Sequence, residues 1–97
     1  MGRIRNWKKK QDFRAKKQYE NGTYTKGQPA VWENTVTGST LQIDREQGGS
    51  FQESVYRIRV TRGGHKPGSL LDKTIRGPYD DARKYAVKWM ENNPAPR

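Results

Sequence analysis

The chain contains no cysteine and a single histidine, His65. The first absence excludes disulfides and thiolate metal sites, and it leaves no redox signature of the compartment. The scarcity of histidine excludes a histidine-rich metal centre. The lone His65 also lies in a glycine-containing loop, which is a poor basis for a catalytic triad. Asp44, Glu46 and Glu53 could in principle share a divalent ion, but their spacing is unspecific. We therefore expect no enzyme activity, no catalytic residue, no bound metal and no cofactor.

Long apolar runs are also missing. Nothing in the sequence approaches the ~20 apolar residues of a membrane span, and the first residues lack the apolar stretch of a signal peptide. Apolar residues make up only 30% of the chain and charged residues 31%, which fits a small folded body joined to an unfolded segment. These properties predict a soluble cytoplasmic protein without membrane contact.

Positive charge, in contrast, is abundant and unevenly distributed. The chain carries 20 Lys or Arg against ten Asp or Glu, a formal net charge of +10. Residues 1–26 hold nine of the basic and two of the acidic residues, a net of +7, whereas the remainder is nearly balanced at +3. We interpret residues 1–28 as a basic N-terminal arm, flexible and disordered or only locally helical, and residues 29–94 as one folded domain. A polyanion is the expected partner of such an arm, and nucleic acid is the commonest polyanion in a cell.

The expected domain follows a β-β-β-β-α pattern, or β-β-β-α if the first strand is irregular. Alternating apolar residues and turn signals predict strands over 30–34, 39–45, 55–61 and 70–76. Gly77-Pro78 opens a helix that Asn92-Asn93-Pro94 ends, and its apolar face comprises Ala82, Tyr85, Ala86, Trp89 and Met90. The predicted fold is α+β: a small antiparallel sheet of three to four strands, covered on one face by a single C-terminal helix.

The uncovered face of this sheet is the first candidate site. If Tyr56, Ile58 and Val60 pack on the helix, Arg57 and Arg59 project the other way, roughly 6 to 7 Å apart, which is close to the spacing of successive phosphates or bases. We expect the row to be extended across neighbouring strands by Arg45 and Lys73. The alternative is an ordinary solvated face, on which the arginines are balanced by Asp44, Glu46 or Glu53.

The arm and one turn supply the other candidates. Arg3 and Arg5 near the terminus resemble the arms with which other proteins enter the DNA minor groove. The lysines that follow can neutralise phosphates, while the interleaved Trp7, Phe13 and Tyr19 can stack on bases or sugars. Arg62 and Lys66 flank the Gly63-Gly64 turn, whose backbone N–H groups could bind a phosphate. These candidates are Arg3, Arg5, Lys8, Lys9, Lys10, Lys16, Lys17, Arg62 and Lys66. The alternatives are a solubilising tail, a basic patch for the ribosome or anionic lipid, and a flexible hairpin tip.

Residues 56–94 resemble a known arrangement of strands and helix. The Tyr56-Arg57-Ile58-Arg59-Val60 strand, a glycine turn, the strand over 70–76 and the helix start Tyr79-Asp80-Asp81-Ala82 are similar to the three-stranded-sheet-plus-helix DNA-binding domains of plant ethylene-response factors and phage integrase arm-binding domains. That resemblance implies a sheet in the DNA major groove, with Arg57 and Arg59 on the reading face. The start of the chain, Gly2-Arg3-Ile4-Arg5-Asn6-Trp7, and its ending from Ala86-Val87-Lys88-Trp89-Met90 to Pro94 also look similar to small basic proteins, themselves uncharacterised, of haloarchaea and their viruses.

We therefore predict a non-enzymatic nucleic-acid-binding protein with DNA favoured over RNA, most simply double-stranded DNA, located in the cytoplasm with the nucleoid. One alternative is an RNA-binding or ribosome-associated protein, with Trp32 or Tyr24 stacking on unpaired bases. Trp32 is more simply explained as a core residue, because aromatics bury large areas in small domains. The other alternative is a protein-interaction module with an open sheet edge and a sticky basic tail. The oligomeric state is left open.

Overall fold

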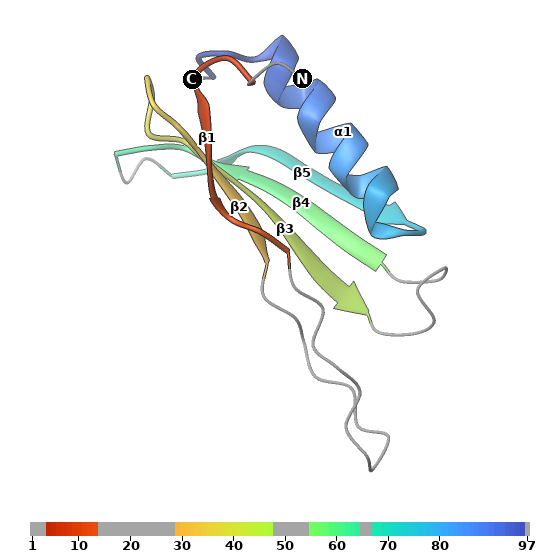
Figure 1. Cartoon of the computed structure of the whole chain (residues 1–97). Helices are drawn as coiled ribbons and strands as arrows, with labels where there is room; N and C mark the ends of the chain where they lie inside the picture. Colours follow the sequence, from red (N-terminus) through yellow and green to blue (C-terminus); the bar gives the residue numbers. More distant parts are fainter. Residues whose placement is uncertain (1–3, 14–28, 48–54, 65–66, 97) are drawn as a thin grey trace.

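The structure is a computed structural model that describes residues 4–13, 29–47, 55–64 and 67–96. The described residues form β1 (Trp7–Gln11), β2 (Ala30–Asn34), β3 (Thr40–Gln47), β4 (Val55–Thr61), β5 (Ser69–Arg76) and α1 (Tyr79–Asn92). The strands form one antiparallel sheet in the order β1-β2-β3-β4-β5, and α1 lies across one of its faces (Figure 1). The α+β fold with one C-terminal helix is as predicted, but the sheet has five strands, and the expectation of three to four was wrong.

The additional strand is β1, which lies inside the segment expected to be a disordered or locally helical arm. Its Trp7 stands opposite Asn34 of β2, is only 6% exposed, and packs edge-on against Trp89 with ring centroids 6.1 Å apart. The Trp7 indole N–H also donates a hydrogen bond to the Asn93 carbonyl at 3.0 Å. Residues 7–11 therefore belong to the domain, because one buried tryptophan anchors them there. Residues 1–3 and 14–28 of the expected arm lie outside the described residues.

The face under α1 holds the apolar core. Leu41 and Ile43 of β3 and Ile58 and Val60 of β4 have no exposed area, and Trp32 is 3% exposed, which confirms the core assignment of that tryptophan. From α1 the core receives three buried side chains: Ala82, Ala86 and Met90. The predicted apolar face of the helix is slightly too wide, since Tyr85 lies at its margin and is 36% exposed.

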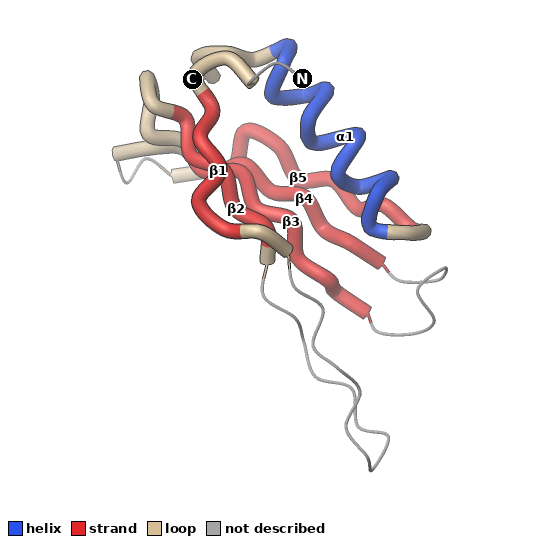
Figure 2. Tube along the Cα trace, viewed as in Figure 1, coloured by secondary structure: helices blue, strands red, loops and turns tan. Residues whose placement is uncertain are grey.

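A buried asparagine fixes the end of the sheet near which the C-terminus lies (Figure 2). Asn34 is 1% exposed, its Nδ2 donates to the Pro94 carbonyl at 2.9 Å, and its Oδ1 accepts the backbone N–H groups of Val36 and Thr37, each at 2.9 Å. The turn predicted over residues 35–38 is therefore stabilised by the residue that precedes it. Asn6, at a left-handed φ of 65°, donates to the same Pro94 carbonyl at 3.0 Å, so β1, this turn and the C-terminus are tied together.

Candidate nucleic-acid interface

The face of the sheet opposite α1 is polar and charged. Cross-strand partners share a face, so the residues that alternate with the core residues can be read from the register. Among the described residues this face carries five cations and four anions: Lys8, Lys10, Arg57, Arg59 and Arg76 against Glu33, Asp44, Glu46 and Asp72. None of the aromatic side chains in the described part of the chain lies on it. We call this surface the uncovered face.

Arg57 is held in place at the centre of the uncovered face. Its Nε lies 2.8 Å from Asp72 Oδ1 and its Nη2 lies 2.6 Å from Asp72 Oδ2, a bidentate pair, while its Nη1 is 3.9 Å from Glu46 Oε1. The hydrogen bonds and the charge of Asp72 raise the pKa of the Arg57 guanidinium, and those hydrogen bonds hold the pKa of the Asp72 carboxyl below its usual value. The fork of Arg57 is therefore oriented before any ligand arrives.

Arg59 belongs to a second, looser group on the same face. Its Nη2 is 4.0 Å from Asp44 Oδ2, and the Gln42 side-chain amide donates to the same oxygen at 2.7 Å. The register confirms the prediction that Arg57 and Arg59 project away from the helix. It also places next to them the carboxylates Asp44 and Glu46, as the solvated-face alternative requires. Glu53 lies outside the described residues.

Two of the predicted face residues lie on the other side of the sheet. Arg45 stands opposite Tyr56 and is 4% exposed, and Lys73 stands opposite Ile58, with its Nζ 5.9 Å from the centroid of the Tyr85 ring on α1. The prediction that they extend the arginine row was wrong, because a side chain opposite a core residue faces the helix. On β5 it is Asp72, Thr74 and Arg76 that share the uncovered face, a set that only the strand register could identify.

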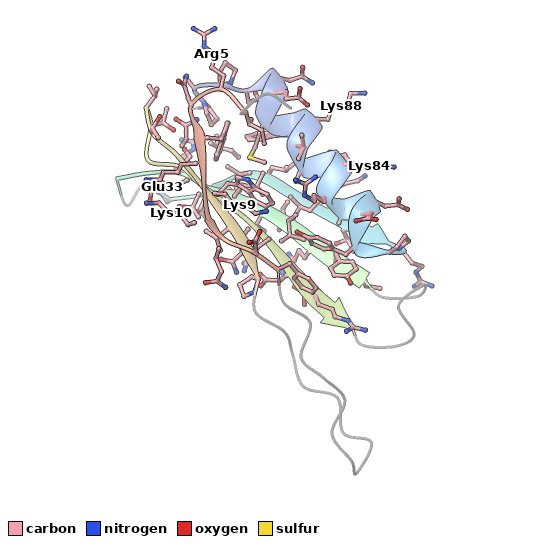
Figure 3. All side chains as sticks on the ribbon, in the orientation of Figure 1. Arg5, Lys9, Lys10, Glu33, Lys84 and Lys88 are labelled. Atoms are coloured by element: carbon pink, nitrogen blue, oxygen red, sulfur yellow. The ribbon has the colours of Figure 1, made fainter. Side chains whose placement is uncertain are left out.

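The three lysines of β1 divide between the two sides of the sheet. Lys8 stands opposite Glu33 and the Lys10 ammonium is 4.0 Å from Glu33 Oε1, so both belong to the uncovered face. Lys9 lies opposite Trp32 with its Nζ 5.4 Å from that ring centroid, and it pairs with Asp12 (Figure 3). Two further candidates, Arg5 before β1 and Arg62 after β4, are exposed. Of the remaining candidates, Arg3, Lys16, Lys17 and Lys66 lie outside the described residues.

The basic connection between β1 and β2 starts and ends at one place on the sheet. Gln11 pairs with Val31, and its side-chain amide donates to the Pro29 carbonyl at 2.8 Å. Phe13, the last described residue before the connection, stacks on Tyr79 with centroids 4.5 Å apart and an interplanar angle of 16°. The basic connection holds most of the expected arm, and the described residues on both sides of it are attached to the sheet. Its basic residues are Arg14, Lys16, Lys17 and Lys26.

The geometry of the described residues defines a small antiparallel meander with one helix and one charged face on which no described aromatic side chain lies. The chain matches no protein-family model, no curated protein and no solved structure. The resemblance to sheet-type DNA-binding domains therefore stays a prediction. In the described part of the chain, the single helix is too short and too polar to cross a membrane.

Proposed function

We propose that this protein binds nucleic acid without catalysing a reaction, and that double-stranded DNA is its preferred partner, which would place it with the nucleoid. One observation carries the proposal: the described aromatic side chains lie off the uncovered face, whereas Arg57 and Arg59 of β4 lie on it together with Lys8 and Lys10 of β1. The face is thus equipped for hydrogen bonds and ion pairs, and its described residues provide no aromatic ring on which bases could stack.

The absence of an aromatic ring among the described residues of the uncovered face favours a duplex over a single strand. Proteins that bind unpaired bases stack them on exposed aromatic rings, whereas duplex bases offer only their edges. Trp32, the described residue that the RNA alternative requires, is 3% exposed beneath α1. Arginine, glutamine and carboxylate side chains are the groups that recognise base edges in a groove, and Arg59, Gln42 and Asp44 provide all three types.

The two parts of the surface have different electrostatic roles. With five cations and four anions, the uncovered face is nearly neutral and attracts phosphates weakly by itself. The excess charge lies in residues 1–26, with a net of +7, and Lys8 and Lys10 bring part of it onto the uncovered face. Phosphate neutralisation is therefore assigned to β1 and the basic connection. Base-edge contact is assigned to Arg57 and Arg59, since a guanidinium has five N–H donors and Asp72 engages only two from Arg57.

Fluorescence anisotropy with labelled double-stranded DNA, single-stranded DNA and structured RNA tests the proposal across a salt series. The matched variants are Lys8→Ala with Lys10→Ala, Arg57→Ala with Arg59→Ala, and, as a control, Lys84→Ala with Lys88→Ala on the outer side of α1 (Figure 3). Each pair removes two positive charges. We expect duplex preference, a salt slope of about −0.9 per phosphate contact, and a slope reduced by about two in the β1 variant. The arginine variant should lose duplex preference, and the control should bind as the unaltered chain does.

Three results would contradict the proposal. Absence of binding at low salt would exclude nucleic acid as the partner. Equal binding to every polymer, reduced equally by all three variants, would mean that net charge alone is responsible. Preference for unpaired RNA, with quenching of tryptophan fluorescence, would favour the RNA-binding alternative.

A further inference from the structure

The two edge strands of the sheet differ in how they are protected against pairing. β1 has five residues, a lysine run and a register shift between Lys9 and Gln11, which are features that block strand addition. β5 has eight residues. Its single lysine, Lys73, lies on the covered face, and its register shift is confined to the start of the strand, so that Leu71–Arg76 pairs regularly with β4. Within the described part of the chain, nothing pairs with the outer side of β5. Six regularly paired residues form an edge long enough to accept a further strand, and β5 is less protected than β1.

We propose that β5 pairs in antiparallel fashion with β5 of a second copy of this chain, about a two-fold axis at Thr74. Directly opposite residues in an antiparallel pair share a face, so in a symmetric pair one residue must lie on the axis opposite its own copy. The proposal concerns the edge of the sheet and does not rest on nucleic-acid binding.

Charge selects the residue on the axis. An axis at Asp72 would oppose two carboxylates and an axis at Lys73 two ammonium groups, both of which are unfavourable. An axis at Thr74 places Asp72 opposite Arg76 of the second copy, and the symmetry makes this pair twice on the uncovered face. On the covered face the same register puts Lys73 opposite Ile75 of the second copy, so that the lysine stem covers a half-buried apolar side chain. Among axes within β5, the one at Thr74 alone brings opposite charges together.

Asp72 can accept a second arginine while keeping the first. Each of its oxygens receives one hydrogen bond from Arg57, whereas a carboxylate has about four lone-pair positions. Its side chain is 43% exposed, and Arg76 is exposed as well. The contact therefore joins two preformed charged groups, and the uncovered faces of the two copies become one continuous surface.

Cross-linking through an introduced cysteine tests the position of the axis. The chain has no cysteine, so each single-cysteine variant reports on one position. Thr74→Cys brings two thiols together at the axis, where opposite Cα atoms about 4.5 to 5.5 Å apart allow a disulfide. The control is Thr61→Cys, which is exposed on the same face of β4. We expect disulfide-linked dimers to form at least about tenfold faster at position 74. Equal rates would overturn the proposal.

Charge exchange between two variants tests the register itself. In a dimer of Arg76→Glu, each introduced glutamate would face Asp72 of the other copy. In a dimer of Asp72→Lys, each introduced lysine would face Arg76 of the other copy. Because like charges repel, each variant alone should sediment near the monomer mass of 11.2 kDa. Mixed in equal amounts they restore both pairs, and we expect dimers of about twice that mass at about 1 mM, where weak contacts are occupied. The control is Lys88→Glu on α1, which replaces a positive by a negative charge as Arg76→Glu does, but away from the β5 edge. It should dimerise as the unaltered chain does.

Circular dichroism melts accompany the sedimentation, since Asp72→Lys also removes the bond to Arg57. The proposal is overturned if the unaltered chain sediments as a monomer at about 1 mM, or if the mixture of folded variants stays monomeric. If Asp72→Lys does not fold, the cross-linking rates of the two cysteine variants decide the question.

Discussion

The two faces of the sheet are built from alternate residues of the same strands, yet they differ in almost every physical property. Along β4, Tyr56 and Ile58 are at most 2% exposed under α1, whereas the side chains of the alternating residues Arg57 and Arg59 are 37% and 42% exposed. The covered face is apolar and aromatic. The uncovered face is a network of ion pairs without a described aromatic ring.

This contrast separates stability from recognition. Burial of one large apolar side chain contributes roughly 1.5 to 3 kcal/mol, whereas an exposed ion pair contributes about 0 to 1 kcal/mol. The free energy of folding therefore comes from the covered face, and the side chains of the uncovered face can be selected for what they bind. Because α1 is the single helix among the described residues that covers the sheet, each core residue beneath it should matter greatly for stability.

The largest expected effect comes from truncating the core at the centre of β4. Ile58→Ala removes a side chain with no exposed area and should lower the free energy of unfolding by about 2 to 5 kcal/mol. The adjacent Arg59→Ala loses a 4.0 Å contact with Asp44 and the attraction of its charge to Asp72 on β5, both at the solvent-exposed surface, and should cost less than about 1 kcal/mol. Urea unfolding followed by circular dichroism measures both variants. Similar losses at the two positions would mean that the faces do not divide stability as we infer.

A polar residue on the covered side should have the next largest effect. Asn34→Ala leaves the Pro94 carbonyl and the turn N–H groups of Val36 and Thr37 with one partner fewer, at a cost of about 1 to 3 kcal/mol. Asn92→Ala, at the exposed end of α1, is the matched control. Thermal melts should show a lower midpoint for the first variant only; equal midpoints would show that the buried amide contributes nothing.

Strands with alternating residues, and the helix, could be predicted from the sequence because their periodicity is local. Tyr56, Ile58 and Val60 identify one face by themselves, and so the orientation of Arg57 was predictable. β1 could not be recognised, because Trp7 is its only buried residue and the lysines that follow it give no alternation. Trp7 itself was visible in the sequence. It indicates a strand only once its ring is known to pack against Trp89 of the helix.

The failures at the candidate site have two different origins. Arg45 follows Leu41 and Ile43 at a spacing of two residues, so the alternation along β3 already placed it on the apolar face, and that signal was overlooked. Lys73 could not be placed in this way, because Leu70 and Leu71 are both apolar and only the pairing with Ile58 decides which face is covered. A shift of one residue moves every side chain to the opposite face, and register depends on neighbouring strands that are distant in sequence. The carboxylate partner of Arg57, Asp72, was unpredictable on the same grounds.

A smaller effect should appear in alkali on the covered side. Partial burial raises the pKa of Tyr79 to about 12, and this ring stacks on Phe13. The unfolded chain loses the phenol proton near its usual pKa of 10.0 while the folded chain keeps it, so stability should fall as the pH rises from 10.0 to about 12. Tyr79→Phe should fall less over that range. Urea unfolding at several pH values measures this difference; identical pH profiles would contradict the burial of the phenol.

The smallest expected effect lies on the uncovered face, and its pH dependence has the opposite sign. Arg57 holds the pKa of the Asp72 carboxyl below its usual value of 3.8, so the ion pair adds stability above that pH and loses its contribution as the pH falls further and the carboxyl takes up a proton. Asp72→Asn should therefore be slightly less stable than the unaltered chain near neutral pH and equal to it in acid. The difference should also shrink in high salt, because both groups are exposed to solvent. A double-mutant cycle with Arg57→Ala, measured by urea unfolding, isolates the pair. A coupling energy that is unchanged at low pH and in high salt would mean that Asp72 stabilises the sheet by packing. Both faces would then contribute to the free energy of unfolding.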